Sequence, residues 1–311
     1  MNLEFEKAIT ELDEKIAALP AQDRTPQQTA EFEKLQKAKD AALKEIYSAL
    51  TPWQTVQVAR HPERPLIQDF IAGLFSEFIE LHGDRLFGDD HAIVGGFATL
   101  DTWRVMVIGH QKGRGIDDNL KFNFGMARPE GYRKAMRLMH MAEKFKVPVV
   151  CFIDTPGAYP GADAEERGQA EAIARNLMEM SALKTPVIVA VTGEGGSGGA
   201  LGIGVGDVLL MMSNAVYSVI SPEGCASILW RDGTKAPEAA TALKITAQAL
   251  LKLKVIDEIV PEPIGGAQRD PKAAIAALRK VLIRNLDRLT HTSTSKLLKR
   301  RFEKYARIGS Y

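Results

Sequence analysis

The sequence feature that most restricts the fold is a glycine run at 193–202, which follows a short apolar segment almost directly. That segment, residues 187–191, consists of valine, isoleucine and alanine, a composition typical of a strand buried on both faces. Five of the seven residues at 193–199 are glycine, and Ala200 and Leu201 then favour a helix. The sequence therefore predicts a strand, a tight turn and a helix N-terminus, whose free N–H groups and positive dipole end suit an oxyanion.

Several interpretations of this glycine run compete. A phosphate-binding P-loop would need Lys and then Ser or Thr after its glycines, but Ala200 and Leu201 stand there. A nucleophile elbow centred on Ser197 would need an acid and then a histidine further along, and only His291 follows, in a basic tail. An oxyanion hole made of backbone N–H groups and close helix-to-strand packing without a ligand both stay open. In the first of these, glycine gives a ligand access to the backbone.

Composition and charge limit the remaining function classes. The 311 residues can form one large or two medium domains, and 45% hydrophobic residues suffice for a substantial core. A net charge of +1 argues against a nucleic-acid binder. The longest apolar runs are strand-sized and the N-terminus is charged, so we expect neither a signal peptide nor a membrane span. We therefore expect the protein to be cytoplasmic. Cys151 and Cys225 are far apart, which signals neither a disulfide nor a zinc site; we expect Cys151 in the core.

The N-terminal part of the chain reads as two helices. Apolar residues recur at helical spacing over 3–19, and Pro20 ends that segment. Thr25 and Pro26 are suited to the cap and first turn of a second helix, over 26–49. We expect a helical hairpin that contacts another subunit or packs as a lid.

The middle of the chain alternates strand-like and helix-like segments, as in an α/β protein. Helices are predicted at 66–81, 129–146 and 164–182, and strands at 92–100, 104–110, 147–153 and 187–191. The first two strands should form a hairpin through Asp101 and Thr102. His110 at the end of the second is expected to be a structural hydrogen-bonding residue rather than a ligand or base.

A second glycine turn, at 154–161, follows the strand predicted at 147–153. It precedes the glycine run by about forty residues, the length of one further helix and strand. Because the ends of parallel strands meet at one edge of a sheet, we expect 155–161 and 195–200 to line one cleft. Two such turns side by side favour a ligand site over simple packing.

Positive charge is concentrated between the hairpin and the second turn. Residues 111–137 contain seven basic residues and three acidic ones. This excess suits a polyanionic small molecule such as a nucleotide-bearing cofactor.

Three motifs resemble the carboxyltransferase alpha subunits of bacterial acetyl-coenzyme A carboxylases. They are Gly-Glu-Gly-Gly-Ser-Gly-Gly-Ala-Leu at 193–201, Asp-Thr-Pro-Gly-Ala-Tyr-Pro-Gly at 154–161, and Ser-Val-Ile-Ser-Pro-Glu-Gly-Cys-Ala-Ser-Ile-Leu-Trp at 218–230. The similarity runs from the N-terminal hairpin through 261–267. It implies a crotonase-like fold, a spiral of stacked ββα units, with this division of the chain: a helical hairpin at 1–52, a stiff linker at 53–65, the crotonase-like domain at 66–290, and a basic helical tail at 291–311.

The resemblance also implies a reaction, transfer of the carboxyl group of carboxybiotin to acetyl-CoA to give malonyl-CoA for fatty acid synthesis. Backbone N–H groups of Gly198, Gly199 and Ala200 would form an oxyanion hole for the ureido oxygen of biotin. The freed ureido nitrogen could remove the proton from the acetyl methyl group, so no side-chain base is needed. The residues implied to line the biotin side of the cleft are Gly157, Ala158, Tyr159, Gly161, Gly195 and Gly196.

The same resemblance implies partners. A beta subunit that carries a zinc ribbon and a second oxyanion hole would complete an α2β2 heterotetramer. Carboxybiotin would arrive on a biotin carboxyl carrier protein, and a separate biotin carboxylase would consume ATP. No metal is expected in this chain.

Charge and local pattern suggest roles for several further side chains. From charge, Arg128 and Arg133 are candidates for the phosphates of coenzyme A. Glu223 could orient a substrate but fits better as part of a capped helix start after Ser221. The tail has six basic residues at 296–307 against Glu303 and should pack on a partner or stay solvated. A Ser197 hydrolase of the same fold and a non-catalytic scaffold remain as alternative functions.

Overall fold

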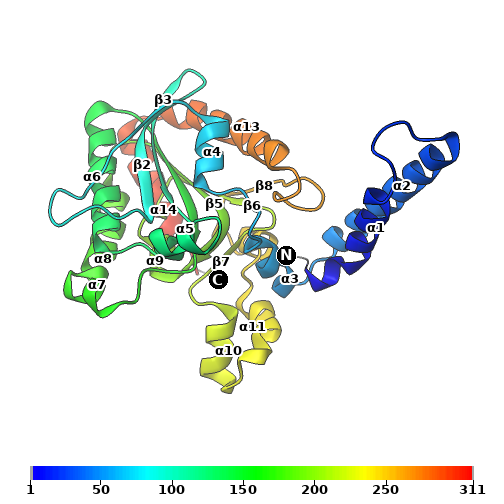
Figure 1. The fold of residues 1–311 in the computed structure, drawn as a ribbon. Coiled ribbons are helices and arrows are strands. Elements are labelled where there is room, and N and C mark those ends of the chain that lie inside the picture. The colour runs from blue at the N-terminus through cyan, green and yellow to red at the C-terminus, as the bar shows by residue number, and fades with distance from the viewer. Residues whose placement is uncertain (1–2, 310–311) are drawn as a thin grey trace.

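Eight strands form one mixed sheet in the computed structural model, which describes residues 3–309 (Figure 1). Their order across the sheet is β1-β2-β3-β4-β5-β6-β8, and β7 pairs with the end of β5. The strands are β1 (Ser76–Glu80), β2 (Ile93–Leu100), β3 (Trp103–His110), β4 (Val149–Thr155), β5 (Val187–Gly196), β6 (Val208–Met212), β7 (Val216–Ser218) and β8 (Glu258–Val260). The first three are antiparallel neighbours, and from β3 onward all pairs are parallel.

Helices cover both faces of this sheet, with α6 and α8 on one side and α4 and α13 on the other (Figure 1). The helices are α1 (Lys7–Ala17), α2 (Pro26–Ser48), α3 (Pro52–Ala59), α4 (Ile67–Leu74), α5 (Ile116–Lys121), α6 (Pro129–Phe145), α7 (Ala162–Glu166), α8 (Gln169–Ala182), α9 (Ser197–Leu201), α10 (Pro222–Trp230), α11 (Ala236–Leu243), α12 (Ala247–Lys252), α13 (Pro271–Thr290) and α14 (Thr294–Ala306). Short 3-10 turns lie at Glu4–Glu6, Asn123–Gly125 and Gly233–Lys235.

The central strands β4, β5 and β6 are buried along their whole length, as a parallel sheet covered on both faces requires. The predicted hairpin is confirmed as β2 and β3, which pair from Ile93–His110 to Leu100–Trp103. The predicted helix at 129–146 is confirmed as α6, and the strand predicted at 147–153 as β4. Cys151 lies in the core, as expected, and burial raises the pKa of its thiol.

The N-terminal helices α1 and α2 form the predicted hairpin and project from the body (Figure 1). Thr25 caps α2 in a capping box with Gln28. At its base Glu6 accepts a hydrogen bond from Tyr47 at 2.7 Å and pairs with Arg269 at 3.0 Å. The hairpin is therefore fixed to the segment that precedes α13.

The segment at 53–65 is not simply the stiff linker that its prolines suggested. Most of it is helix α3, which a second capping box at Thr51 initiates. Val56 and Ala59 pack with Val216 and Ile245 in a small cluster beside the end of the sheet. The segment therefore belongs to the packed body, although the division of the chain into the four expected units stays a prediction.

Two predicted helices are interrupted. The helix expected at 66–81 ends at Leu74, because residues 76–80 pair with β2 and become β1. The helix expected at 164–182 is divided into α7 and α8 at Gly168, whose φ of 83° is incompatible with a continuous helix. In both places tertiary pairing or backbone conformation overrides the helical spacing of apolar residues.

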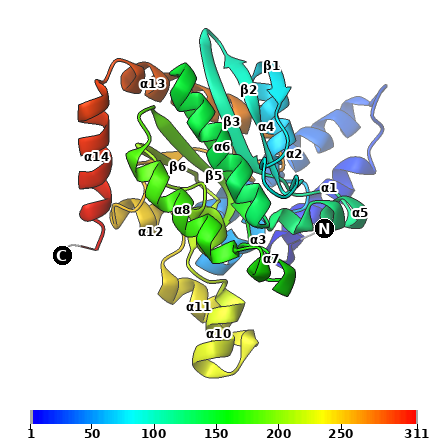
Figure 2. The same cartoon turned by 90° about the vertical axis from the view of Figure 1, so that its left-hand side faces the viewer.

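The basic tail packs partly on this chain itself, while four of its six basic residues, Lys296, Lys299, Arg300 and Arg307, are exposed as expected of a solvated face, and contact with a partner stays a prediction. Arg301 in α14 is 1% exposed, and it pairs with Asp207 at 2.7 Å. It also donates to the carbonyl groups of Met180, Leu183 and Thr185. The helix thereby packs on the segments that lead into β5 and β6, and residues 310–311 of the expected tail lie outside the described part. A different element, the α10–α11 pair, projects from the body (Figure 2).

Candidate functional site

The two glycine turns lie side by side at one edge of the sheet, as predicted. Strand β4 ends at Thr155 and the neighbouring parallel strand β5 ends at Gly196. Thr155 pairs with Gly195, so strands β4 and β5 end at the same level of the sheet. The turns expected at 155–161 and 195–200 are therefore adjacent, and a cleft between them stays a prediction.

The glycines at 196 and 199 are required by close backbone packing, which differs from the expectation that they serve ligand access. A Cβ atom on Gly196 would lie under 3.0 Å from the Pro156 carbonyl, and one on Gly199 equally close to the backbone of Gly157. Real Cβ atoms essentially never approach so closely. The strand also continues to Gly196, so part of the predicted turn belongs to β5.

The accessible part of the turn is narrower than the glycine run. Ser197 is exposed and Gly198 is half-buried, whereas Gly199 and Ala200 are buried. The first turn of a helix leaves its N–H groups without intrahelical acceptors. Within residues 3–309 no acceptor contacts the backbone N–H groups of Gly198 and Gly199. The N–H of Ala200, the next along the same turn, likewise contacts no acceptor within the described residues, so these three groups are the backbone donors that the turn can offer to an anion.

The second turn lies against the first. Gly157, Ala158 and Tyr159 are half-buried, and a Cβ on Gly157 would meet open space. The N–H of Gly157 donates to Thr155 Oγ1 at 3.1 Å, and that of Tyr159 donates to the Ala127 carbonyl at 3.0 Å. This loop therefore supplies shape and surface, while its own amides are largely engaged. Gly161 gives way to the Tyr159 ring, which occupies the space a Cβ would need.

Asp154, near the end of β4, links the segment that follows β3 to β5. Its carboxylate accepts a hydrogen bond from Lys112 Nζ at 2.6 Å and one from the backbone N–H of Glu194 at 3.0 Å. Gly193 leaves room for it, because a Cβ there would lie 2.5 Å from Asp154 Oδ1. Lys112 is thus engaged within the protein rather than free to bind an anion.

Two arginines that sequence analysis missed hold the end of β5. Arg64 donates to the Thr192 carbonyl at 2.7 Å and pairs with the buried Glu262, and Arg60 pairs with Glu194 and Glu223 at 2.6 Å each. Burial alone would raise the pKa of Glu262, but the charge of Arg64 and several hydrogen bonds lower it. The prolines around these arginines suggested a linker, and nothing in the local pattern indicates partners so distant in sequence.

The capped helix start predicted after Ser221 is confirmed, with Glu223 in its first turn, and Glu223 has a further role that was not predicted. Its carboxylate binds Arg60, whereas the hydroxyl of Ser221 caps α10 through the Gly224 N–H at 3.1 Å. Burial opposes the ionised form of Glu223, but the hydrogen bond from Arg60 contributes to a pKa below its ordinary value.

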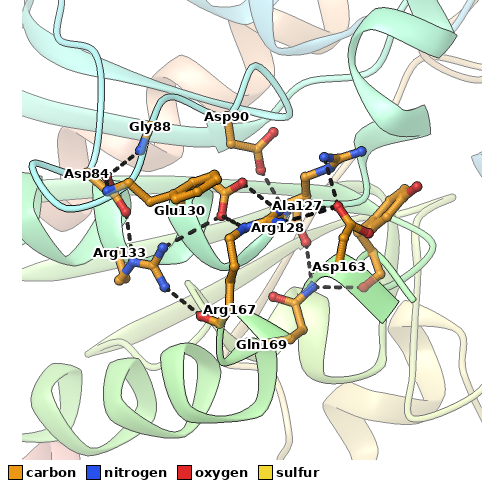
Figure 3. A network of polar contacts seen from close by, with 12 residues as sticks. Asp84, Gly88, Asp90, Ala127, Arg128, Glu130, Arg133, Asp163, Arg167 and Gln169 are labelled. Atoms are coloured by element: carbon orange, nitrogen blue, oxygen red, sulfur yellow. Dashed lines mark hydrogen bonds and ion pairs between the residues drawn. The ribbon is translucent and has the colours of Figure 1, made fainter. Parts of the chain in front are cut away.

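Arg128 and Arg133 both lie in a polar network beside the second turn (Figure 3). The guanidinium of Arg128 lies over the Tyr159 ring, 4.4 Å from its centroid, and pairs with Asp163 at 3.2 Å. Its Nε is buried without a hydrogen-bond partner among the described residues. Arg133 pairs with Asp84 at 2.8 Å and donates to the Arg167 carbonyl at 3.0 Å. Of the two, Arg128 is the one that contacts a residue of the second turn, Tyr159.

Beneath the glycine turn lies His110, which is 1% exposed. It was expected to be a structural hydrogen-bonding residue, yet neither ring nitrogen has a partner of good geometry in the described structure. Burial lowers its pKa to about 4, against smaller opposite effects of Asp154 and of the nearby Gly199 and Phe152 carbonyls. The ring is therefore neutral near pH 7.

A Ser197 hydrolase finds no support in this arrangement. Ser197 does have the positive φ, 52°, that suits a nucleophile elbow. His291, however, lies at the end of α13, where its ring contacts the Asp287 carbonyl at 2.7 Å. No group of three or more His, Cys, Asp or Glu side chains suited to a metal ion occurs within the described residues either. The chemistry available at this edge is that of backbone donors.

A mixed sheet of this topology, with paired glycine turns at the ends of adjacent parallel strands, defines an enzyme-like protein of the crotonase-like fold class. The model of the family described as acetyl co-enzyme A carboxylase carboxyltransferase-like matches residues 2–309. The chain belongs to that family.

Relatives support this membership over the full length. The chain is 56% identical to the acetyl-coenzyme A carboxylase carboxyl transferase subunit alpha of Geobacter metallireducens, over 99% of this chain and 98% of the relative. It is 55% identical to the protein of the same name from Photobacterium profundum, again over 99% and 98%.

Solved structures show the same fold at low sequence identity. A transcarboxylase 12S structure matches with a TM-score of 0.60 and 18% identity, over 73% of this chain and 42% of that chain. A Pseudomonas malonate decarboxylase hetero-tetramer in complex with coenzyme A matches with a TM-score of 0.57 and 17% identity, over 71% of this chain and 90% of that one. The predicted crotonase-like fold is confirmed.

None of the helices described here is both long and apolar enough to cross a membrane.

Proposed function

We propose that this chain is the alpha-subunit half of a carboxyltransferase that moves the carboxyl group of carboxybiotin to acetyl-CoA, giving malonyl-CoA for fatty acid synthesis. The observation that carries the proposal is the full-length match to the carboxyltransferase family, in a fold that brings both of the motif turns to one sheet edge. We place the protein in the cytoplasm as part of this proposal.

The chemistry assigned to this chain is electrostatic. Carboxybiotin supplies the carboxyl group, and its ureido oxygen gains negative charge as that group leaves. The N–H groups of Gly198 and Gly199, followed by that of Ala200, are positioned to donate to such an oxygen. One donor of this kind contributes about 3 kcal/mol of transition-state stabilisation.

The second turn is proposed to form the wall against which the biotin ring lies. Gly157 leaves open space, Ala158 adds a small apolar surface, and Tyr159 with Gly161 closes the end of the wall. Gly195 and Gly196 act less directly, since they allow β5 to approach Tyr217 and the Pro156 carbonyl.

Among the basic residues, we assign the phosphates of coenzyme A to Arg128 rather than to Arg133. Arg128 stands at the second turn with an unpaired buried Nε and one carboxylate partner that is 45% exposed. Arg133 pairs with the buried Asp84, so it joins α6 to the loop at 83–90. It also donates a hydrogen bond to the Arg167 carbonyl.

The proposal includes partners that complete the site. A zinc-ribbon beta subunit would contribute the second oxyanion hole in an α2β2 assembly, and a biotin carboxyl carrier protein would deliver carboxybiotin. A biotin carboxylase would charge the carrier with ATP.

Co-purification and reconstitution test the proposal. The tagged chain should bring a zinc-containing second chain out of its native host, and only the mixture should form malonyl-CoA from acetyl-CoA and the charged carrier. Malonyl-CoA formation by this chain alone, or none by the mixture, would contradict the proposal.

A further inference from the structure

A buried side-chain hydroxyl contacts the carbonyl of Gly199 from inside the protein. The hydroxyl of Tyr132, in α6, donates to the Gly199 oxygen at 3.3 Å, and Tyr132 is fully buried. Tyr132 has not been given a role in the proposed reaction.

Gly199 is also confined on its other side. A Cβ atom there would overlap the backbone of Gly157 and Ala158, so the second turn presses on the first without a gap. Its peptide bond to Ala200 is trans, as are all the described peptide bonds. In a trans peptide the N–H points opposite to the C=O, so a contact that fixes the Gly199 carbonyl also fixes the direction of the Ala200 N–H.

Tyr132 is itself held in place. The side chain of Asn176, in α8, donates to the carbonyls of Tyr132 and Gly202 at 2.9 Å each. The Tyr132 ring fills the space that a Cβ on Gly202 would occupy. Burial raises the pKa of the Tyr132 hydroxyl, which keeps it protonated and able to donate. Helix α9 therefore rests on a polar seat contributed by α6 and α8.

We propose that Tyr132 is a positioning residue that fixes the Gly199–Ala200 peptide and, through it, the backbone donors of the glycine turn. The role rests on the proposed carboxyl transfer, because only a reaction that uses those donors would respond to their orientation. Donors act on a transition state only when they are aimed where charge develops, so loosening this seat lowers kcat and leaves ground-state binding intact.

The test compares Tyr132→Phe with a matched control, Tyr47→Phe. Tyr132→Phe removes one oxygen and keeps the ring that packs on Gly202. Tyr47 also has a half-buried hydroxyl that donates to a protein acceptor, Glu6, but it lies at the base of the N-terminal hairpin. Amide hydrogen exchange over 193–204 and steady-state kinetics of the assembled enzyme are both measured.

We expect Tyr132→Phe to speed exchange in the turn and to lower kcat about tenfold, with KM for acetyl-CoA within about twofold of wild type. Tyr47→Phe should change neither quantity. Unchanged exchange and unchanged kcat in Tyr132→Phe would overturn the proposal, as would a rise in KM at constant kcat. A wild-type assembly without transferase activity would contradict the proposed function instead, and the exchange rates would still decide whether this side chain holds the turn.

Discussion

Arg60 binds the carboxylate of Glu194, a residue within the glycine run, although 134 positions separate them. The Nη2–Oε1 distance is 2.6 Å, and a second contact at 2.6 Å joins Arg60 to Glu223 at the start of α10. Four residues later Arg64 donates to the Thr192 carbonyl. The segment after α3 therefore clamps alternate residues of β5 just before the chain turns, which makes the N-terminal region part of the support of the site.

Breaking the Arg64–Glu262 pair should destabilise the protein strongly. The two side chains are 2% and 0% exposed, so Arg64→Met leaves a buried carboxylate without its counter-ion. We expect a loss of about 3–5 kcal/mol in the free energy of unfolding, measured by urea denaturation. Arg114→Met is the control, because the Arg114–Asp69 pair is 56% and 29% exposed and should contribute no more than about 1 kcal/mol. Equal losses in the two variants would show that the buried pair is not a special support.

Much of the site edge could be predicted from the sequence because it depends on local patterns. Apolar β-branched runs gave the positions of β4 and β5, and parallel strands place their following turns together. The capping residues Thr25 and Ser221 marked helix starts that the structure has at the same places.

The support of the site could not be predicted, because it depends on contacts between distant segments. Arg60 and Arg64 lie among prolines that indicate a linker, and their partners follow more than a hundred residues later. The purpose of Gly199 was also misjudged: composition cannot distinguish a glycine that admits a ligand from one that admits a neighbouring backbone, here that of Gly157.

The buried His110 should make the stability of the chain depend on pH. Its folded pKa of about 4 lies below the ordinary 6.5, and Lys112 and Asp154 are the charged groups that act on it. Above pH 6.5 the ring is neutral in both states and its contribution is complete. Between pH 6.5 and 4 only the unfolded state takes up the proton, so the free energy of unfolding decreases as the pH is lowered. The decrease is about 2 kcal/mol from pH 7.5 to 5.0.

Comparison with His110→Phe isolates that effect. Urea unfolding of wild type and variant at pH 7.5 and 5.0 should give a drop that is larger for wild type by this amount. The same drop in both proteins would show that His110 does not titrate as its burial implies.

Removing the hydroxyl of Ser197 should leave the reaction intact. Alanine at this exposed position keeps a Cβ and the backbone N–H groups, so kcat of the assembled enzyme should stay within about threefold of wild type. A fluorophosphonate probe should not label Ser197. A fall of about 10⁴-fold or more would instead assign Ser197 the part of a nucleophile.

The two arginines of Figure 3 should respond differently to truncation. Arg128→Ala should raise KM for acetyl-CoA about tenfold, since a charge-assisted contact to a phosphate is lost. Arg133→Ala should leave KM unchanged but lower the melting temperature, because the buried Asp84 loses its partner. Kinetics and thermal denaturation of both variants check this, and an unchanged KM in Arg128→Ala would dismiss the phosphate assignment.

The most direct measurement is carboxyl transfer by the assembled enzyme with Gly199→Ala, beside Gly198→Ala as control. A Cβ on Gly198 would meet only Ile173, at 3.7 Å, whereas one on Gly199 would displace the turn from Gly157. If backbone donors at this turn stabilise the developing charge, Gly199→Ala should lose at least about a hundredfold in kcat, with assembly retained, and Gly198→Ala should stay near wild type. A folded, assembled Gly199→Ala enzyme of undiminished kcat would contradict the account.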